Sequence, residues 1–289
     1  MRDSRPAVGG DTARGAEAEG SSGSRSAFVL LLGPCVLEDD DLNLEVARGV
    51  RAAARERDFP VVFKASFDKA NRSRLGSPRG PGLSRGVEQL LRVREATGLP
   101  ILTDVHEPGQ AAPAAEVADV LQIPAFLCRQ TALLTAAGRT GRAVNVKKGQ
   151  WMSAEAMAGA VEKVRAGGAR RVFVTERGTA FGYGDLVVDM RNFSRIRRAT
   201  GAPAIFDGTH SVQRPGGLAD GSTSGAPEHI AALVRAAVAA GCDGLFLEVH
   251  PDPPSAPSDS TNMLPLDKLS GLLGEVAAIR AALAPGASA

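Results

Sequence analysis

A short apolar segment of strand type that ends in a polar or charged side chain, followed by a helix-like stretch, recurs eight times along the chain. The eight segments are residues 27–35, 60–67, 100–105, 118–125, 143–148, 171–177, 203–210 and 244–250. Parallel strands need long crossover connections, and the helices in those connections cover the sheet. Eight such units therefore predict an α/β fold of the (β/α)8 TIM barrel type, a closed parallel sheet inside an outer ring of helices.

The stretches between these segments have the spacing and the turn residues of helices. The expected helices are residues 42–57, 84–97, 109–117, 129–137, 153–166, 186–200, 227–240 and 265–283. In the seventh of them, Ile230, Val234 and Ala237 follow the three-four spacing of a buried helix face. A chain of 289 residues suits one barrel, because such barrels commonly take about 250 residues. We expect a single catalytic barrel over 27–284, between a disordered tail at 1–26 and a short C-terminal tail at 285–289.

Composition excludes several classes of partner. The 34 Lys and Arg residues nearly balance the 32 Asp and Glu residues, so the net charge of +2 does not indicate a nucleic-acid partner. No apolar run approaches the roughly 20 residues needed to cross a membrane, and the first 26 residues lack the apolar core of a signal peptide. Three cysteines are an odd number for a disulfide framework and favour a reducing cytoplasm. Of these, Cys128 and Cys242 are expected to be structural.

Cations gather at the ends of three strand-type segments. Lys64, Lys147 and Arg177 end the second, fifth and sixth segments, and Lys69 and Arg72 follow the second. In a (β/α)8 barrel these strand ends converge on the active site, and Arg and Lys bind phosphate or carboxylate oxygens. A doubly anionic small molecule is the expected ligand.

The alternative is that the cations form salt bridges around the rim. The candidate partners are Glu176, Glu107 and Asp104. We disfavour this alternative because so few acids would leave part of the basic wall unpaired.

A second group of side chains has a different chemistry. Cys35, His210 and Glu248 end or follow the first, seventh and eighth segments, which become neighbours when a barrel closes, and Asp259 lies in the connection after the eighth. A thiolate, an imidazole and two carboxylates suit a borderline divalent cation such as Zn²⁺, Mn²⁺ or Fe²⁺. Taken singly, each residue could have an ordinary structural role, so the residues alone leave both interpretations open.

Three connections are too long and too polar to be simple turns. They are residues 68–83, 211–225 and 251–264, and each follows the C-terminal end of a strand-type segment. Loops in that position build the sites of barrel enzymes. We expect these three to line the site.

Eight motifs resemble those of the 3-deoxy-D-manno-octulosonate 8-phosphate synthase (2-dehydro-3-deoxyphosphooctonate aldolase) family. They are KASFDKANRSR (64–74), RGPGL (79–83), TDVHE (103–107), LQIPAFLCRQT (121–131), VNVKKGQWMS (144–153), TERGTAFGYGDLVVDMR (175–191), FDGTHSVQRPGG (206–217) and FLEVHPDP (246–253). They cover nearly all of 28–269 in the order of that family. The resemblance implies a cytoplasmic homotetramer that condenses phosphoenolpyruvate with D-arabinose 5-phosphate and water and releases phosphate. Its product would feed the inner core of Gram-negative lipopolysaccharide.

The resemblance also implies roles for individual residues. Phosphoenolpyruvate would be bound by Lys64, Ser66, Lys69, Gln122, Ala125, Lys147 and Arg177, and Phe126 would also bind substrate. Arabinose 5-phosphate would be bound by Asn71, Arg72, Ser73 and, from a neighbouring subunit, Arg129. The catalytic residues would be Lys64, Asp104 near the sugar, Lys147, His210 and Asp259.

The same resemblance bears on the metal. Members of the family with Cys at the position of Cys35 depend on a metal, whereas members with Asn there do not. The resemblance therefore implies one divalent ion, Mn, Zn or Fe, bound by Cys35, His210, Glu248 and Asp259.

Two other functions are consistent with such a barrel. One is a related synthase that uses erythrose 4-phosphate or an amino sugar, and the motif Asn71–Ser73 favours arabinose 5-phosphate over these. The other is a non-catalytic phosphosugar-binding barrel, which we disfavour because none of the cations or metal ligands is lost.

Overall fold

A closed sheet of eight parallel strands forms the centre of the structure, a computed structural model that describes residues 27–284 except 73, 182, 220 and 222. The strands are β1 (Val29–Gly33), β2 (Val61–Lys64), β3 (Ile101–Asp104), β4 (Val120–Ile123), β5 (Ala143–Lys147), β6 (Val172–Glu176), β9 (Ala204–Asp207) and β12 (Gly244–His250). They follow one another around the sheet in chain order, and the pairing of β1 with β12 closes it. The predicted barrel is confirmed. The predicted tails at 1–26 and 285–289 lie outside the described residues.

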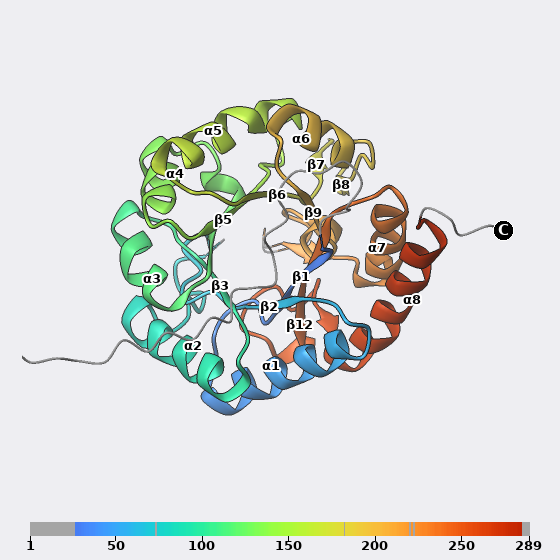
Figure 1. Ribbon diagram of the computed structural model, residues 1–289. Coiled ribbons are helices and arrows are strands. Elements are labelled where there is room, and N and C mark those ends of the chain that lie inside the picture. Colours follow the sequence, from blue (N-terminus) through green and yellow to red (C-terminus); the bar gives the residue numbers. More distant parts are fainter. Residues whose placement is uncertain (1–26, 73, 182, 220, 222, 285–289) are drawn as a thin grey trace, which may run out of the picture.

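Eight helices form a ring around this sheet (Figure 1). They are α1 (Asp40–Arg55), α2 (Leu83–Thr97), α3 (Ala111–Val117), α4 (Thr131–Arg139), α5 (Ala158–Gly167), α6 (Asn192–Thr200), α7 (Ile230–Ala239) and α8 (Leu269–Ala282). No helix within the described part of the chain is long and apolar enough to cross a membrane. Single 3₁₀ turns occupy Pro108–Gln110, Ala125–Leu127, Glu155–Met157, His210–Val212, Pro227–His229, Pro253–Ser255 and Leu266–Lys268.

One predicted helix begins in the wrong place. The helix expected over 186–200 starts only at Asn192, because Leu186 and Val187 form a short strand, β8, that pairs antiparallel with β7 (Thr179–Ala180). Gly184 lies between the two strands with φ of 93°, a left-handed conformation that favours glycine and allows the chain to reverse. Three further short strands flank the barrel mouth: β10 (Gln213–Arg214), β11 (Ser224–Gly225) and β13 (Leu264–Pro265).

The barrel interior changes from apolar to polar along each strand. An apolar cluster fills its centre, formed by Leu31, Leu102, Val120, Ile205 and Phe246 with four partly buried neighbours. Side chains alternate along a strand, so residues two positions apart share a face. The residues two positions beyond this cluster are therefore inside as well, and they include Asp104, Gln122, Asp207 and Glu248, all of them buried. The polar side chains therefore lie next to this apolar cluster, on its side toward the C-terminal ends of the strands.

Helices α4 and α5 pack closely because two glycines face each other between them. A Cβ atom on Gly138 would lie 2.2 Å from the carbonyl oxygen of Val164 and 3.0 Å from the Cα atom of Gly167. Gly159, on the exposed side of α5, has no atom within 4 Å of such a position.

We expect Gly138→Ala to lower the free energy of unfolding by about 2 kcal/mol, since the added methyl group overlaps backbone that cannot move without shifting a helix. Gly159→Ala is the matched control. It should leave stability unchanged or raise it by up to about 1 kcal/mol, because alanine favours a helix where space is free. Denaturant unfolding of both variants measures this, and equal destabilisation of the two would contradict the close packing.

Candidate active site

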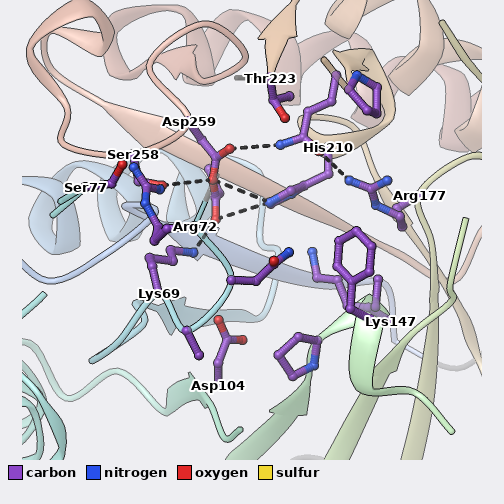
Figure 2. A pocket seen from close by; sticks show the side chains of 18 of the residues that line it. Lys69, Arg72, Ser77, Asp104, Lys147, Arg177, His210, Thr223, Ser258 and Asp259 are labelled. Atoms are coloured by element: carbon purple, nitrogen blue, oxygen red, sulfur yellow. Dashed lines mark hydrogen bonds and ion pairs between the residues drawn. The ribbon is translucent and has the colours of Figure 1, made fainter. Parts of the chain in front are cut away.

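A cavity of about 890 Å³ opens at the C-terminal ends of the barrel strands. Each of the three long connections contributes to its lining, with Lys69 and Arg72 from the first, Gln213 from the second and Asp259 from the third. The expectation that these connections line the site is confirmed. Figure 2 shows Arg72 and Arg177 on opposite sides of the cavity, with His210 and Asp259 between them.

Two of the predicted cations are already paired with acids. Lys64, from β2, bonds to Glu248 Oε1 on β12, and Lys147, from β5, bonds to Asp207 Oδ2 on β9. All four side chains are buried. Glu248 and Asp207 were not among the candidate partners Glu176, Glu107 and Asp104, and each lies on a strand two places around the sheet from its lysine. Lys147 Nζ also lies 3.1 Å from the ring centroid of Phe246, a cation–π contact.

The two arginines are different, because each keeps a donor without a partner. Arg177 donates from Nη2 to Gln213 Oε1, while its Nη1 is buried without a hydrogen-bond partner among the described residues. Arg72 bonds through its terminal nitrogens to Ser258 Oγ and the carbonyl oxygen of Pro257, and its buried Nε likewise lacks a partner. A buried donor without a partner is costly, so these atoms mark positions where an anion would be stabilised.

Asp104 is ionised. Burial alone would raise its pKa, but the charges of Lys69, Lys64 and His106 together with the hydrogen bond from Ser66 lower the pKa to about 2. Ser66 Oγ donates to one carboxylate oxygen at 2.5 Å, and Gln122 Nε2 donates to the other. An acid that has lost its proton near neutral pH cannot serve there as a proton donor.

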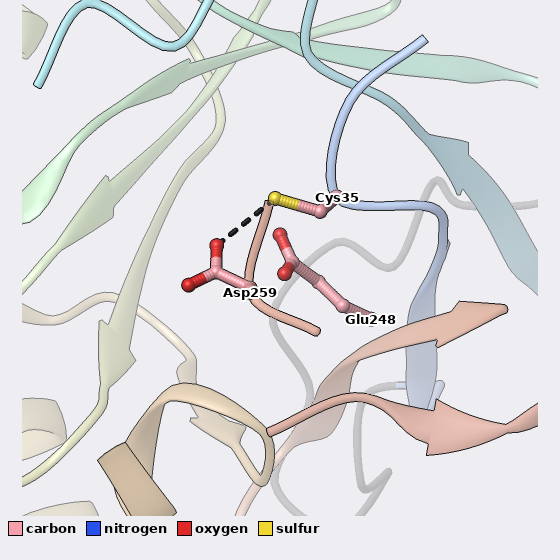
Figure 3. A group of neighbouring side chains, drawn as sticks. All are labelled: Cys35, Glu248 and Asp259. Atoms are coloured by element: carbon pink, nitrogen blue, oxygen red, sulfur yellow. Dashed lines mark hydrogen bonds between the residues drawn. The ribbon is translucent and has the colours of Figure 1, made fainter. Parts of the chain in front are cut away.

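Cys35, Glu248 and Asp259 form a tight cluster of metal-ligand type (Figure 3). One ligand atom from each lies within 4.8 Å of the others, and the Cys35 thiol donates to Asp259 Oδ2 at 2.9 Å. Burial, together with Asp259 and Glu248, raises the pKa of the thiol well above its usual range. Glu248 Oε2 is buried and has no hydrogen-bond partner within the described part of the chain.

His210 lies at the edge of this cluster. Its Nε2 atom is 3.8 Å from Glu248 Oε1 and 3.9 Å from Asp259 Oδ2, and its Nδ1 atom is 2.9 Å from Asp207 Oδ2. The predicted neighbours Cys35, His210, Glu248 and Asp259 therefore do come together.

The other predicted residues are placed less uniformly. Asn71, Ala125 and Phe126 line the cavity, whereas Ser66 is buried, donates to Asp104 and does not line it. Arg129 is exposed just before α4, outside the cavity lining, and Ser73 lies outside the described residues.

Sequence reasoning missed two residues that hold the site together. Asp207 anchors both Lys147 and His210, and Gln213 donates to Asp259 Oδ1 at 2.8 Å while accepting from Arg177. Alternation from the apolar residue Ile205 would have placed Asp207 inside the barrel. Gln213 follows a 3₁₀ turn, and no periodicity predicts its direction.

Comparisons with known proteins identify the family. The sequence profile of the DAHP synthetase I family matches residues 11–282. A protein of Nitratidesulfovibrio vulgaris (strain DP4) named 2-dehydro-3-deoxyphosphooctonate aldolase is 57% identical over 250 residues, which are 86% of this chain and 91% of that protein. A protein of the same name from Syntrophotalea carbinolica is 53% identical over 259 residues, 90% of this chain and 93% of its own.

A third relative of that name, from Cyanothece sp. (strain PCC 7425 / ATCC 29141), is 50% identical over 264 residues, 91% of this chain and 96% of its own. The family profile extends over all eight strands of the barrel, from β1 to β12. The family expected from the motifs is confirmed: the chain belongs to the 2-dehydro-3-deoxyphosphooctonate aldolases, within the wider DAHP synthetase I family.

Proposed function

We propose that this enzyme condenses phosphoenolpyruvate with D-arabinose 5-phosphate and water, giving 3-deoxy-D-manno-octulosonate 8-phosphate and phosphate. The names of its relatives support this reaction. The observation that carries it is the cavity itself, in which Arg177 and Arg72 each keep an unpaired buried donor on opposite sides of the His210–Asp259 pair. Two separated donors fit two anionic substrates.

Phosphoenolpyruvate is assigned to the side of the cavity with Lys147, Arg177 and Gln122. The phosphate of the sugar is assigned to the side with Asn71 and Arg72. Bringing two polyanions together would fail through their repulsion in a poorly solvated cavity unless fixed cations opposed it. The lysines paired with Glu248 and Asp207 are held in one position, so they need no reorganisation when the substrates bind.

The reaction forms one carbon–carbon bond and breaks one bond to phosphate. C3 of the enol phosphate attacks the aldehyde carbon of the sugar, the carbonyl oxygen takes a proton, and C2 becomes cationic in character. Water adds at C2 and loses a proton, and the hemiketal phosphate then expels inorganic phosphate. Asp104 is ionised and carries a fixed negative charge beside the sugar. His210 lies with Nδ1 next to Asp207 and with Nε2 facing Glu248 and Asp259.

One divalent ion, Mn, Zn or Fe, is proposed for the Cys35–His210–Glu248–Asp259 cluster. The fit is supported by the buried oxygen Glu248 Oε2, which lacks a partner, and by the mixture of sulfur, nitrogen and oxygen donors that borderline cations prefer. The neutral thiol of Cys35 would need a cation nearby to lose its proton. When bound, the ion would supply Lewis-acid and template chemistry.

The setting of the enzyme is proposed from weaker indications. The three thiols Cys35, Cys128 and Cys242 are all free, which favours a reducing cytoplasm. A homotetramer, in which the exposed Arg129 would reach the sugar phosphate of a neighbouring subunit, and a role in lipopolysaccharide synthesis follow from the family resemblance alone.

The direct test is an assay of phosphate release from phosphoenolpyruvate with each of several aldoses, followed by mass analysis of the product. We expect turnover with arabinose 5-phosphate far above that with erythrose 4-phosphate or an amino sugar. Preference for another aldose would identify a related synthase, and binding without turnover of any aldose would identify a non-catalytic barrel.

Arg177→Ala should weaken phosphoenolpyruvate binding by about 1.5–3 kcal/mol, the loss of a charge-assisted hydrogen bond to an anion. Isothermal titration calorimetry measures it, with Arg92→Ala, an exposed arginine on α2, as the matched control. Unchanged affinity in Arg177→Ala would show that the anion binds elsewhere.

Arg72→Ala should weaken arabinose 5-phosphate binding by a similar amount and leave phosphoenolpyruvate binding nearly intact. Ser258→Ala is the control, because it removes one of the two hydrogen bonds between Arg72 and the third connection but keeps the guanidinium. If Ser258→Ala weakens sugar binding as much as Arg72→Ala does, the arginine acts through the loop and not through the phosphate.

Removal of the metal should abolish activity reversibly. Dialysis against a strong chelator should inactivate the enzyme, Mn²⁺ or Zn²⁺ should restore it, and His210→Ala should prevent recovery by removing a ligand. Cys35→Asn should keep some activity in chelator, whereas Cys128→Ser, which changes a buried thiol outside the cluster, should behave as the parent. An active, metal-free parent enzyme by elemental analysis would refute the metal assignment.

A further inference from the structure

A series of buried side-chain hydrogen bonds crosses four consecutive strands of the barrel, from β6 to β3, and ends on Asp104. Thr175 Oγ1 on β6 donates to Asn145 Oδ1 on β5 at 2.7 Å, and Asn145 Nδ2 donates to Gln122 Oε1 on β4 at 2.8 Å. Gln122 Nε2 then donates to Oδ1 of Asp104, which lies on β3. The other carboxylate oxygen of Asp104, Oδ2, accepts from Ser66, which lies just beyond β2. All five side chains are at most 6% exposed.

The order of donors and acceptors in these hydrogen bonds is determined by Asp104. Asp104 is ionised, and a carboxylate can only accept hydrogen bonds. Gln122 must therefore turn its NH₂ group toward Asp104, which leaves its oxygen to face Asn145. That oxygen requires a donor, so Asn145 presents its own NH₂ group and turns its oxygen to the hydroxyl of Thr175.

The orientation of the Gln122 amide matters for the cavity, because only part of this hydrogen-bond series reaches it. Gln122 and Asp104 line the cavity, whereas Asn145 and Thr175 do not. Gln122 Nε2 has two hydrogens, and among the described residues only Asp104 accepts from it. The wall of the cavity at Gln122 therefore offers a donor, and an amide turned the other way would offer an acceptor that repels an anion.

We propose that Asn145 and Thr175 are positioning residues for substrate binding: they lock the Gln122 amide so that it presents N–H to the carboxylate or phosphate of phosphoenolpyruvate. The proposal rests on the proposed function, which assigns that substrate to this side of the cavity. A simpler role for the hydrogen-bond series, the bonding of neighbouring strands to one another, would affect stability but would not act through Gln122.

A double-mutant cycle separates the two roles, with phosphoenolpyruvate affinity measured by isothermal titration calorimetry on the full-length protein. Asn145→Leu and Gln122→Leu should each weaken binding about tenfold, as expected for a donor lost or misdirected at an anion. The double variant should bind no more weakly than Gln122→Leu, because Asn145 has nothing left to orient. Additive losses, or normal affinity in Asn145→Leu, would overturn the proposal.

Two more conservative substitutions, both at Thr175, test the proposal if the Asn145→Leu variant does not fold. Thr175→Val removes the hydroxyl and keeps the shape, and Thr175→Ser keeps the hydroxyl. Thr175→Val should weaken phosphoenolpyruvate binding severalfold with the affinity for arabinose 5-phosphate unchanged, and Thr175→Ser should restore it. Normal binding in Thr175→Val, or equal weakening of both substrates, would overturn the proposal.

Arg177→Ala, measured alongside, distinguishes a failure of this inference from a failure of the substrate assignment. If Arg177→Ala binds phosphoenolpyruvate normally, the assignment of that substrate to this wall is wrong and the inference falls with it. If Arg177→Ala loses affinity but the Asn145 and Thr175 variants do not, the site assignment stands and only the positioning role is refuted.

Discussion

The site depends on two buried lysine–carboxylate pairs, Lys64 with Glu248 and Lys147 with Asp207. A buried charge without a partner costs several kcal/mol, so neither the lysines nor the acids could occupy the barrel interior alone. Each pair joins strands that are distant in the sequence, and each rests on the apolar cluster below it. The barrel thus holds positive charge at its mouth in fixed positions, which a flexible surface could not do.

The two acids also join parts of the site that serve different purposes. Glu248 bonds to Lys64 and belongs to the cluster with Cys35 and Asp259, while Asp207 holds both Lys147 and His210. Through these shared acids, the cations proposed to bind anions and the ligands proposed to bind metal form one network. A substitution on one side of the cavity should therefore affect binding on the other side. The variants of His210 and Arg177 should for this reason be compared with each other.

Much of the fold was predictable from the sequence, because strand-type runs separated by helical spacing have few architectures available to them. The convergence of strand ends in a barrel also predicted that Lys64, Lys147 and Glu248 would lie at the site, and alternation within a strand explains why they face the interior. What it does not reveal is which inward residues of different strands touch, since that depends on the stagger between strands. The pairing of Lys147 with Asp207 was missed for this reason.

Irregular segments were the other source of error. The hairpin of β7 and β8 replaced the start of an expected helix, because its pairing joins residues across a turn that has no periodic pattern. Gln213 was missed on similar grounds. The eight motifs identified the family, but the hydrogen bonds from Thr175 to Asp104 could be recognised only once the strands were placed side by side.

The most direct test of this account is a crystal structure of the enzyme with phosphoenolpyruvate bound. We predict ligand oxygen atoms within hydrogen-bonding distance of Arg177 Nη1 and of Gln122 Nε2, with Lys147 still bonded to Asp207. A ligand bound away from Arg177, or a Gln122 amide that turns its oxygen toward the cavity, would contradict the account.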